Sequence, residues 1–283
     1  MARLSVVIPS RDGADYLPAT LDSLLAQEGV EVSVAVCVDA SVDGTLGLLV
    51  DRPVVKYEVY PIREPKDYTR VPLLLNIAMR LVPEADYYMV SGDDTTYPPD
   101  YAYRIIQQME KHKVSIGSGW SSQYMFRPTN APGGSGRIFT KDAWQLVTPF
   151  PEGIIWETWA LYRALEKGLR LQMFNVQKSH NRPQTAESTI TFGYAAHMLG
   201  TPILFTAFRV LLEMWRGPRR RWPAFMILVG QLEYTVKCKP RREDIVPYVK
   251  KTKYRQLWRN VKTLFIRRTL LFVRRKIRKD ARA

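Results

Sequence analysis

The chain has 283 residues, 46% of them hydrophobic, which predicts one large folded domain with an appended segment. Its two cysteines, Cys37 and Cys238, stand far apart and outside any Cys-x-x-Cys pair, which argues against a disulfide framework or a zinc site and makes Cys37, in an apolar run, a core residue. The net charge of +15 belongs to the C-terminal part, because residues 1–215 hold 20 Lys/Arg against 23 Asp/Glu (net −3), whereas residues 216–283 hold 22 against 4 (net +18).

Strands and helices alternate along the first two thirds of the chain. Met1-Ala2-Arg3 leads directly into the first strand without a signal-peptide pattern, so the catalytic part is expected on the cytoplasmic side. The patterns predict strands at 4–8, 32–38, 54–60, 87–90, 114–119 and 169–176, and helices at 16–27, 71–81, 99–112 and 156–168. This alternation predicts an α/β fold with a doubly wound, mostly parallel sheet.

The stretch from Tyr87 to Asp100 carries the clearest chemical signal. A short run of strand formers ends in two adjacent carboxylates, Asp93 and Asp94, which are followed by a Pro-Pro pair. The two acids are therefore expected on the loop that leaves the carboxyl end of a strand, where open α/β sheets bind ligands. Two carboxylates there suit a hard divalent cation and, through it, a diphosphate. The alternative is an acidic turn that caps the next helix.

The C-terminal part has a different composition. Residues 188–208 contain no Asp, Glu, Lys or Arg and approach the roughly 20 residues of a membrane span, although they are only weakly apolar. Two further apolar runs, 222–232 and 257–277, alternate with arginines. Apolar helices bracketed by basic and Trp residues are typical of membrane interfaces, so residues 188–283 are predicted to be a basic, apolar, helical, membrane-associated region. The alternative is a soluble helical subdomain with a basic face.

Four short motifs follow one another in the N-terminal half with a specific spacing. They are Val6-Val7-Ile8-Pro9-Ser10, Asp39-Ala40-Ser41-Val42-Asp43-Gly44-Thr45, Asp93-Asp94, and Trp156-Glu157 with Arg163 and Gly168. Together they resemble the family 2 glycosyltransferases, whose catalytic domain is the nucleotide-sugar-binding GT-A fold, over about residues 4–182. The resemblance implies a GT-A catalytic domain at 1–187 that uses a nucleoside-diphosphate sugar as its donor.

The resemblance assigns the donor pocket to strand ends. Pro9 and Asp12 follow the first strand and Asp39 follows the second, where the family carries an aspartate that hydrogen-bonds the base. A carboxylate accepts from a ring N–H of uracil or guanine alike; an Asx turn is the alternative for Asp39. Arg70 and Asn76 match a cation and an asparagine that the family carries on the helix before the metal loop. Arg70 is thus expected to bind donor phosphate, against the alternative of a solvated surface arginine.

The metal loop departs from the Asp-x-Asp of the family. Asp94 takes the place of the last Asp and Gly92 that of the first, so Asp93 is expected to compensate. His180 resembles the third metal ligand of some relatives, against the alternative of a structural histidine. The resemblance therefore implies Mn²⁺ or Mg²⁺ held by these three side chains and bridging the donor diphosphate. Arg137, which follows a glycine-rich stretch, is expected to shape the cleft, unless that stretch is a flexible surface loop.

Glu157 is the candidate general base. Most relatives carry Glu-Asp at the start of a helix, and counting back from Gly168 and Arg163 puts Glu157 at the Asp and Trp156 at the Glu. The resemblance implies that Glu157 takes a proton while the acceptor oxygen attacks C1 from the face opposite the diphosphate, which inverts the anomeric centre. An ordinary carboxylate in the first turn of a helix, complementing the helix dipole, is the alternative.

The basic, apolar tail points to a lipid-linked acceptor, because it would hold the domain against anionic headgroups. The whole chain resembles archaeal membrane-associated enzymes that transfer mannose from GDP-mannose to dolichyl phosphate or to a lipid-linked glycan. The expected partners are a nucleotide sugar, a polyprenyl/dolichyl-phosphate lipid and the membrane, but no nucleic acid. The alternatives are a UDP-sugar-dependent transferase with a glycan hydroxyl acceptor, a basic nucleic-acid-binding protein and a soluble nucleotidyltransferase.

Overall fold

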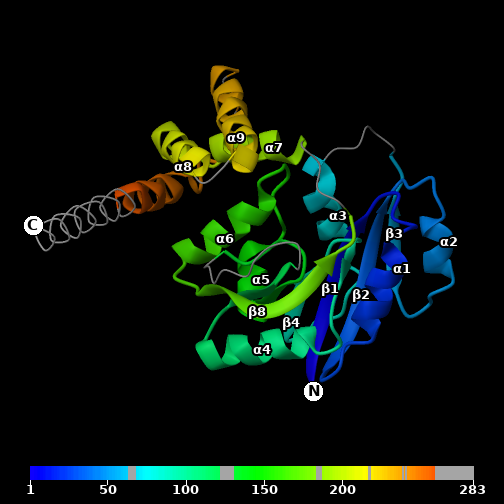
Figure 1. Ribbon diagram of the computed structural model, residues 1–283. Coiled ribbons are helices and arrows are strands. Elements are labelled where there is room, and N and C mark those ends of the chain that lie inside the picture. The colour runs from blue at the N-terminus through cyan, green and yellow to red at the C-terminus, as the bar shows by residue number, and fades with distance from the viewer. Residues whose placement is uncertain are drawn as a thin grey trace, which may run out of the picture. The chain divides into compact units, whose positions relative to one another are not determined.

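The chain divides into two compact units, Met1–Gln184 and Thr185–Ala283, close to the expected boundary after residue 187. The computed structural model describes residues 1–62, 68–121, 131–182, 187–215, 218–237, 239 and 241–258. Figure 1 shows strands and helices in the first unit and helices in the second.

Met1–Gln184 is an α/β unit built on an eight-stranded sheet (Figure 1). The strands are β1 (Ala2–Ser10), β2 (Val30–Asp39), β3 (Lys56–Tyr60), β4 (Tyr87–Val90), β5 (Thr95–Thr96), β6 (Ile116–Ser121), β7 (Arg137–Thr140) and β8 (Leu171–His180). The helices are α1 (Leu17–Leu25), α2 (Thr45–Val50), α3 (Val71–Ala78), α4 (Tyr101–His112), α5 (Lys141–Val147) and α6 (Trp156–Glu166), with a 3₁₀ turn η1 at Tyr68–Arg70.

The strand order is β3-β2-β1-β4-β7-β6-β8-β5, and the sheet is mixed. The pairs β1–β2, β1–β4, β2–β3 and β6–β8 are parallel, whereas β7 runs antiparallel to β4 and β6, and β5 antiparallel to β8. Six of the eight strands run in the same direction, as expected of a mostly parallel α/β sheet, and the reversed strands β7 and β5 make the sheet mixed. Parallel neighbours require a long crossover, usually a helix. The chain reverses direction between β6 and β7, which pair antiparallel.

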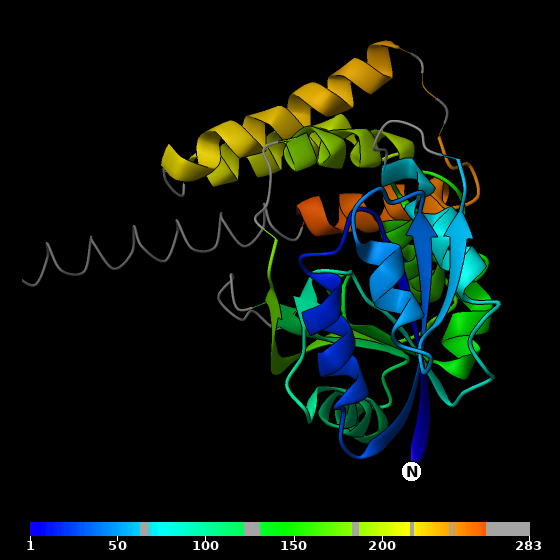
Figure 2. The ribbon, with the colours of Figure 1, turned by 90° about the vertical axis from the view of Figure 1, so that its right-hand side faces the viewer.

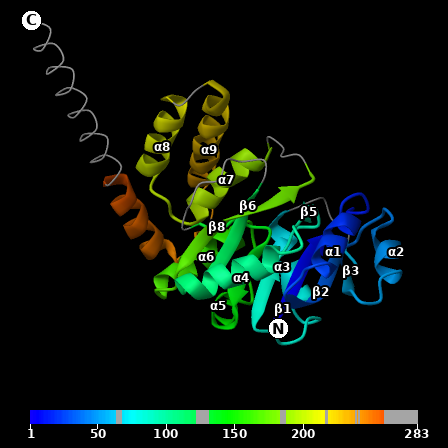
Figure 3. The same cartoon turned by 60° about the horizontal axis from the view of Figure 1, so that its bottom comes forward.

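Helices cover both faces of β1. Leu4, Val6 and Ile8 share one core cluster with apolar residues of α1 and α4. Figure 3 shows these two helices beside the sheet. Val7, which points the other way, is also fully buried, and α3 and α5 contact the sheet as well. Cys37 is confirmed as a buried, free core cysteine, and burial raises the pKa of its thiol to about 12.

The parallel pairing of β1, β2 and β4 determines where a ligand site can form. Their carboxyl ends, at Ser10, Asp39 and Val90, lie at one edge of the sheet because the three strands are adjacent and run the same way. Pro9 and Asp39 lie at the ends of β1 and β2, and the loops after β1 and β4 carry Asp12, Asp93 and Asp94. Ligands of open α/β sheets bind at such an edge.

The second unit is helical, with α7 (Glu187–Met198), α8 (Ile203–Trp215) and α9 (Pro218–Val236), and residues 246–258 are also helical. Both α7 and α8 pack against α9 (Figures 2 and 3). The uncharged stretch at 188–208 is thus divided between two helices, with Gly200 at a φ of +66° between them. No helix in the described part of the chain has the length and apolar content needed to cross a bilayer.

Glycines bring α7 and α9 close together. A Cβ atom on Gly193 would lie 2.3 Å from the carbonyl oxygen of Ile227, and one on Gly230 would lie 2.6 Å from that of Ile190. Buried His197 also joins the two helices, since its ring nitrogens lie 2.9 Å from Thr235 Oγ1 and 2.9 Å from the Lys239 carbonyl oxygen.

Candidate active site

Asp39, at the end of β2, is buried between two arginines. Its Oδ2 atom lies 3.1 Å from Arg70 Nη2 and 3.4 Å from Arg11 Nη1, and only 3% of the residue is exposed. The other oxygen, Oδ1, is buried without a hydrogen-bond partner among the described residues. Burying an unsatisfied acceptor is unfavourable. This oxygen is therefore free to accept an N–H from a ligand.

The Asp93 carboxylate lies against the end of β1. Ser10 Oγ donates a hydrogen bond to Asp93 Oδ2 at 2.9 Å, and Arg182 Nη2 lies 3.5 Å from Oδ1. A Cβ atom on Gly13 would lie 2.8 Å from Asp93 Oδ2, so only a glycine leaves room for this contact. Burial raises the pKa of Asp93, although the nearby Arg182 and Ser10 act in the opposite direction. Asp93 thus connects the metal loop to β1.

Asp94 and His180 face one another beside Thr95. Asp94 Oδ1 lies 3.8 Å from His180 Nδ1, and Thr95 Oγ1 lies 2.9 Å from that nitrogen and 3.2 Å from that oxygen. The backbone holds this arrangement, because Asn181 N donates to the Asp94 carbonyl at 2.8 Å and Thr95 pairs with His180 across β5 and β8. Burial by itself would raise the pKa of Asp94, but His180, Arg182 and Thr95 outweigh it and hold this pKa below its ordinary value.

The 3.8 Å between Asp94 Oδ1 and His180 Nδ1 falls between the two ligand spacings of an octahedral cation. Ligands about 2.1 Å from an octahedral ion lie about 3 Å apart when adjacent and about 4.2 Å apart when opposite. No group of three or more His, Cys, Asp or Glu side chains in the described residues is arranged to hold a metal. The roles of Asp94 and His180 as metal ligands stay predictions; Mg²⁺ commonly completes its shell with substrate phosphates and water. The role of Asp93 as a further ligand stays a prediction.

Gly92 stands where the resemblance implies the first aspartate of an Asp-x-Asp motif, and the structure shows why a glycine fits there. A Cβ atom there would lie 2.9 Å from Asp94 Oδ1. The space is taken by the Asp94 carboxylate itself, so a larger residue at 92 would displace that carboxylate.

Ser135 connects this loop to the glycine-rich segment, residues 133–136. Its hydroxyl accepts a hydrogen bond from Gly92 N at 2.8 Å and donates one to Thr95 Oγ1 at 2.8 Å. The hydroxyl of buried Tyr97 lies 2.9 Å from Ser135 Oγ. The position of Asp94 thus depends on a segment some forty residues further along the chain.

The Glu157 carboxylate contacts the same segment from α6. A Cβ atom on Gly134 would lie 2.3 Å from Glu157 Oε1, so the carboxylate lies directly against the glycine backbone. The start of α6 is held by an aromatic contact between Trp156 and Phe150, with ring centroids 4.9 Å apart. Asn76 fixes Phe150, since its amide makes two 2.8 Å hydrogen bonds with the Phe150 backbone.

Two buried cations lie behind the glycine-rich segment. Lys178 is 3% exposed and donates to the Ser135 carbonyl; Arg137 is 2% exposed and donates to the carbonyls of Pro132 (3.1 Å) and Glu157 (3.3 Å). Burial, and to a smaller extent the charge of Arg137, lowers the pKa of Lys178 to about 7, while Glu157 acts in the opposite direction. Burial also lowers the pKa of Arg137, again against Glu157.

The sequence family of the chain agrees with this geometry. The family model described as "Glycosyl transferase family 2" matches residues 5–165, which is more than half of the chain. The chain belongs to glycosyl transferase family 2. The resemblance seen in the four motifs is thereby confirmed at the level of the family.

Solved structures show the same fold for this family 2 glycosyltransferase. Mannosyltransferase PcManGT from Pyrobaculum calidifontis, in complex with GDP-Man and Mn²⁺, has a TM-score of 0.53 and 16% identity over 81% of this chain and 69% of its own. Glucosyl-3-phosphoglycerate synthase from Mycobacterium tuberculosis, with Mg²⁺ and UDP, has a TM-score of 0.52 and 14% identity over 70% and 76%. S. aureus TarS 1-349 has a TM-score of 0.50 and 15% identity over 70% and 66%, so the chain spans just under two thirds of that fragment.

The remaining predicted residues lie close to the site but contact other partners. Arg70 is paired with Asp39 instead of standing exposed. Asp12, at a φ of +49°, accepts from Val42 N at 3.0 Å and so holds the loop after β2. Pro9 lies in β1 opposite Cys37. The donor-binding roles of these residues and of Asn76 stay predictions.

Several residues of this family 2 site were missed by sequence reasoning. They are Ser10, Arg11, Thr95, Ser135, Lys178 and Arg182. One of them carries a readable signal, because Lys178 continues the buried alternation of Phe174 and Val176 in β8, and a lysine on the buried face of a strand is unusual. The others are short polar residues whose partners lie far away in sequence.

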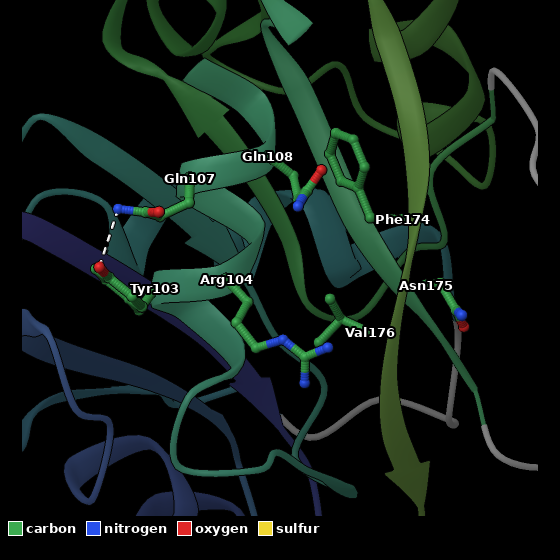
Figure 4. A pocket seen from close by; sticks show the side chains of 7 residues that line it. All are labelled: Tyr103, Arg104, Gln107, Gln108, Phe174, Asn175 and Val176. Carbon is green, nitrogen blue, oxygen red and sulfur yellow. Dashed lines mark hydrogen bonds between the residues drawn. The ribbon is translucent and has the colours of Figure 1, made fainter. Parts of the chain in front are cut away.

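A cavity of about 260 Å³ between α4 and β8 is separate from this site (Figure 4). Arg104, Gln107, Gln108 and Asn175 line it together with Tyr103, Phe174 and Val176. None of the predicted site residues belongs to this lining. Asp39, Asp93 and Asp94 form the candidate active site because they lie at the edge of the sheet where open α/β sheets bind ligands.

Proposed function

We propose that this family 2 chain is an inverting, divalent-cation-dependent hexosyltransferase that uses a nucleoside-diphosphate sugar, with mannose favoured as the sugar and GDP-mannose as the donor. The proposed acceptor is a polyprenyl or dolichyl phosphate, or a lipid-linked glycan, on the cytoplasmic face of a membrane. One observation carries the proposal: Asp39, the Asp93–Asp94 loop and Glu157 belong to one connected cluster at the strand ends.

The donor nucleotide is proposed to bind at Asp39. Its unpartnered Oδ1 would accept an N–H of the base, which removes the penalty of a buried, unsatisfied acceptor. Arg11 and Arg70 bond the other oxygen and so orient the carboxylate.

Asp94 and His180 are proposed to hold the divalent cation at the donor diphosphate. When bound, Mn²⁺ or Mg²⁺ neutralises the negative charge that develops on the leaving nucleoside diphosphate. Thr95 and Ser135 keep the two ligands in position through their hydroxyls.

Glu157 is proposed as the base for acceptors that carry a hydroxyl. The acceptor oxygen would attack C1 as the bond from C1 to the diphosphate oxygen breaks, and its proton would pass to the Glu157 carboxylate. A single displacement from the opposite face inverts the anomeric configuration. Gly134 gives this carboxylate room beside the glycine-rich segment.

The mannose and GDP assignments are supported by the PcManGT structure, which holds GDP-Man and Mn²⁺. The M. tuberculosis synthase holds UDP and Mg²⁺ on a similar fold. A UDP-sugar-dependent transferase with a glycan hydroxyl acceptor is therefore the second candidate, because a carboxylate at Asp39 accepts an N–H from either base.

Membrane association is supported by charge and by exposed apolar side chains in the second unit. Residues 216–283 hold 22 Lys/Arg against 4 Asp/Glu. Leu204, Leu211 and Trp258 are 69%, 65% and 70% exposed. Apolar surface combined with basic charge is the pair of signals that holds peripheral proteins on anionic membranes.

A nucleotide-sugar panel tests the proposal. The full chain is incubated with Mn²⁺, polyprenyl phosphate and one of three donors: GDP-mannose, UDP-glucose or UDP-N-acetylglucosamine. The release of free nucleoside diphosphate and the anomeric configuration of the product are measured.

We expect GDP-mannose to be consumed with inversion. The Asp94→Asn variant should lose at least about 10²-fold in rate, the scale of removing one transition-state charge contact. Asp86→Asn, at an exposed surface pair, is the matched control. Consumption of a UDP-sugar alone would support the second candidate, and release of pyrophosphate would contradict both.

A further inference from the structure

We infer that Lys178 and Arg137 form a buried site for the anionic phosphate group of the acceptor, so that the nucleophile is a phosphate oxygen and not a sugar hydroxyl. This inference rests on the proposed glycosyl transfer and names the acceptor chemistry that the proposal leaves open. Lys178 has no role in the proposed transfer so far, and Arg137 was expected only to shape the cleft. Both are now inferred to bind the acceptor phosphate.

The two cations are buried without an ion pair. Both are at least 97% buried, and their only described hydrogen bonds go to the carbonyls of Ser135, Pro132 and Glu157. No carboxylate in the described part of the chain lies within 4.0 Å of either cation, the separation that defines an ion pair. The Nε atom of Arg137 is buried and has no partner there either.

Such a pair is unfavourable unless an anion completes it. Lys and Arg are almost never fully buried in proteins unless they are paired, because removing an ionic group from water carries a large penalty. Carbonyl oxygens satisfy hydrogen bonds but carry no negative charge. The Glu157 carboxylate acts on both cations but can offset only one of the two positive charges. The second negative charge is therefore expected from a ligand, and a phosphate monoester supplies both that charge and several acceptor oxygens.

The site is next to the reaction centre. Lys178 donates to the carbonyl of Ser135, whose hydroxyl bonds the loop that carries Asp94. Arg137 donates to the carbonyl of Glu157. The two cations therefore contact the segments that carry the proposed cation ligands and the proposed base.

Two neighbouring cations also fit the chemistry of a phosphate nucleophile better than that of a hydroxyl. A phosphate monoester is largely a dianion at pH 7, with a second pKa of about 6. One of its oxygens forms the new bond to C1, the bond from C1 to the diphosphate oxygen breaks, and that electron pair leaves with the nucleoside diphosphate. The charge of the acceptor phosphate changes from −2 to −1, and the leaving nucleoside diphosphate gains one negative charge. The step therefore balances without the transfer of a proton.

Variants at Lys178 test the inference by binding and by transfer. Geranyl phosphate, inorganic phosphate and uncharged geraniol are titrated into the full chain without metal or donor, and binding is followed through the melting temperature. Transfer to geranyl phosphate is then measured with Mn²⁺ and the donor that the panel identifies. Lys178→Met removes the charge at similar length and Lys178→Arg keeps it. Lys141→Met removes an exposed lysine of the same unit and is the matched control.

We expect Lys178→Met to weaken binding of geranyl phosphate by roughly 10- to 100-fold, the scale of one charge-assisted hydrogen bond. The acceptor KM should rise by a similar factor while the donor KM stays within about twofold. Lys178→Arg should recover most of the binding, and geraniol should bind neither form measurably. Tighter binding of geranyl phosphate than of inorganic phosphate supports a lipid source of the anion, and equal binding supports a free phosphate ester.

Three results would overturn the inference. The first is that Lys178→Met binds geranyl phosphate as well as the wild type does. The second is that Lys178→Met weakens the binding of geraniol as much as that of geranyl phosphate. The third is that only the donor KM rises, which would mean that the cations bind the donor diphosphate. Failure of the proposed function looks different: phosphate binding would still depend on Lys178, but the wild-type chain would consume no nucleotide sugar.

Discussion

At the scale of single residues, Asp39 shows how a buried charge is kept ready for a ligand. Two guanidinium groups bond one oxygen of the carboxylate and leave the other without a described partner. The charge is therefore stabilised from one side only, which orients the carboxylate and keeps an acceptor available. An exposed ion pair at Arg3 and Asp86 has no such consequence, because water competes with each partner.

We predict that Asp39→Asn raises the KM for the nucleotide sugar by roughly 10- to 100-fold, with a smaller change in kcat. The neutral amide leaves two buried arginines without their counter-charge and alters the acceptor offered to the base, and breaking a buried pair is strongly unfavourable. Steady-state kinetics and direct binding of the nucleoside diphosphate provide the measurement. Asp86→Asn should leave both unchanged. An unaltered donor affinity in Asp39→Asn would exclude Asp39 from the donor pocket.

Glu157→Gln separates the two classes of acceptor. We expect a loss of about 10²-fold or more in kcat/KM with a hydroxyl acceptor, which needs a base, and a far smaller loss with a phosphate acceptor, which is already ionised. Rates with a soluble glycan and with a polyprenyl phosphate are compared for the same preparation. Equal, small losses with both acceptors would remove Glu157 from the mechanism.

At the scale of elements, contact between two helices of the second unit depends on glycine. Gly193 of α7 lies against the backbone of α9, where an added Cβ would meet the Ile227 carbonyl oxygen at 2.3 Å. The close approach lets buried Gln231 donate from α9 to the carbonyl of Thr201, at 2.6 Å. Here glycine serves packing, although it is an unfavourable helix former.

Gly193→Ala is expected to lower the free energy of unfolding by about 1–3 kcal/mol, the scale of overpacking a filled interface. Gly47→Ala is a matched control, because Gly47 also lies in a helix but an added Cβ there meets nothing within 4 Å. That variant should be neutral or gain up to about 1 kcal/mol from helix propensity. Denaturant melts of the two variants test this. If Gly193→Ala were as stable as Gly47→Ala, the close helix contact would be wrong.

At the scale of the whole molecule, charge divides the chain into a slightly acidic catalytic part and a strongly basic C-terminal part. Residues 216–283 carry a net +18 among large apolar side chains. A basic patch alone is compatible with nucleic acid, but apolar residues between the charges favour a lipid surface. Attraction of this kind weakens as salt screens it.

Co-sedimentation distinguishes the two partners. We predict that the full chain sediments with anionic liposomes at 150 mM salt, binds neutral liposomes weakly and releases as salt rises, since each basic residue near such a surface contributes about 1 kcal/mol. Replacing exposed Lys250 and Lys251 by Gln should reduce partitioning by on the order of tenfold. The same change at exposed Lys111 and Lys113 of the catalytic unit is the control. Binding to duplex DNA in preference to liposomes would contradict the membrane proposal.

The sequence alone was sufficient to predict the family and most elements, while the site roles that it suggests stay predictions. Strand and helix periodicity is local, and so are the turn residues that place Asp39 at the end of a strand, Asp94 in the loop after a strand and Glu157 at the start of a helix. The sequence did not predict α5 or the antiparallel strand β7. The direction of a strand depends on its connection and its neighbours, which local periodicity does not show.

What tertiary structure alone decided is how distant side chains meet. Arg11 and Arg70 reach Asp39 from 28 and 31 residues away, and Lys178 reaches Ser135 from 43. Gly92 could be understood only once the Asp94 carboxylate was seen to fill the space beside it. Such contacts depend on sheet order and packing, which no local pattern encodes, and they turn a set of isolated polar residues into one site.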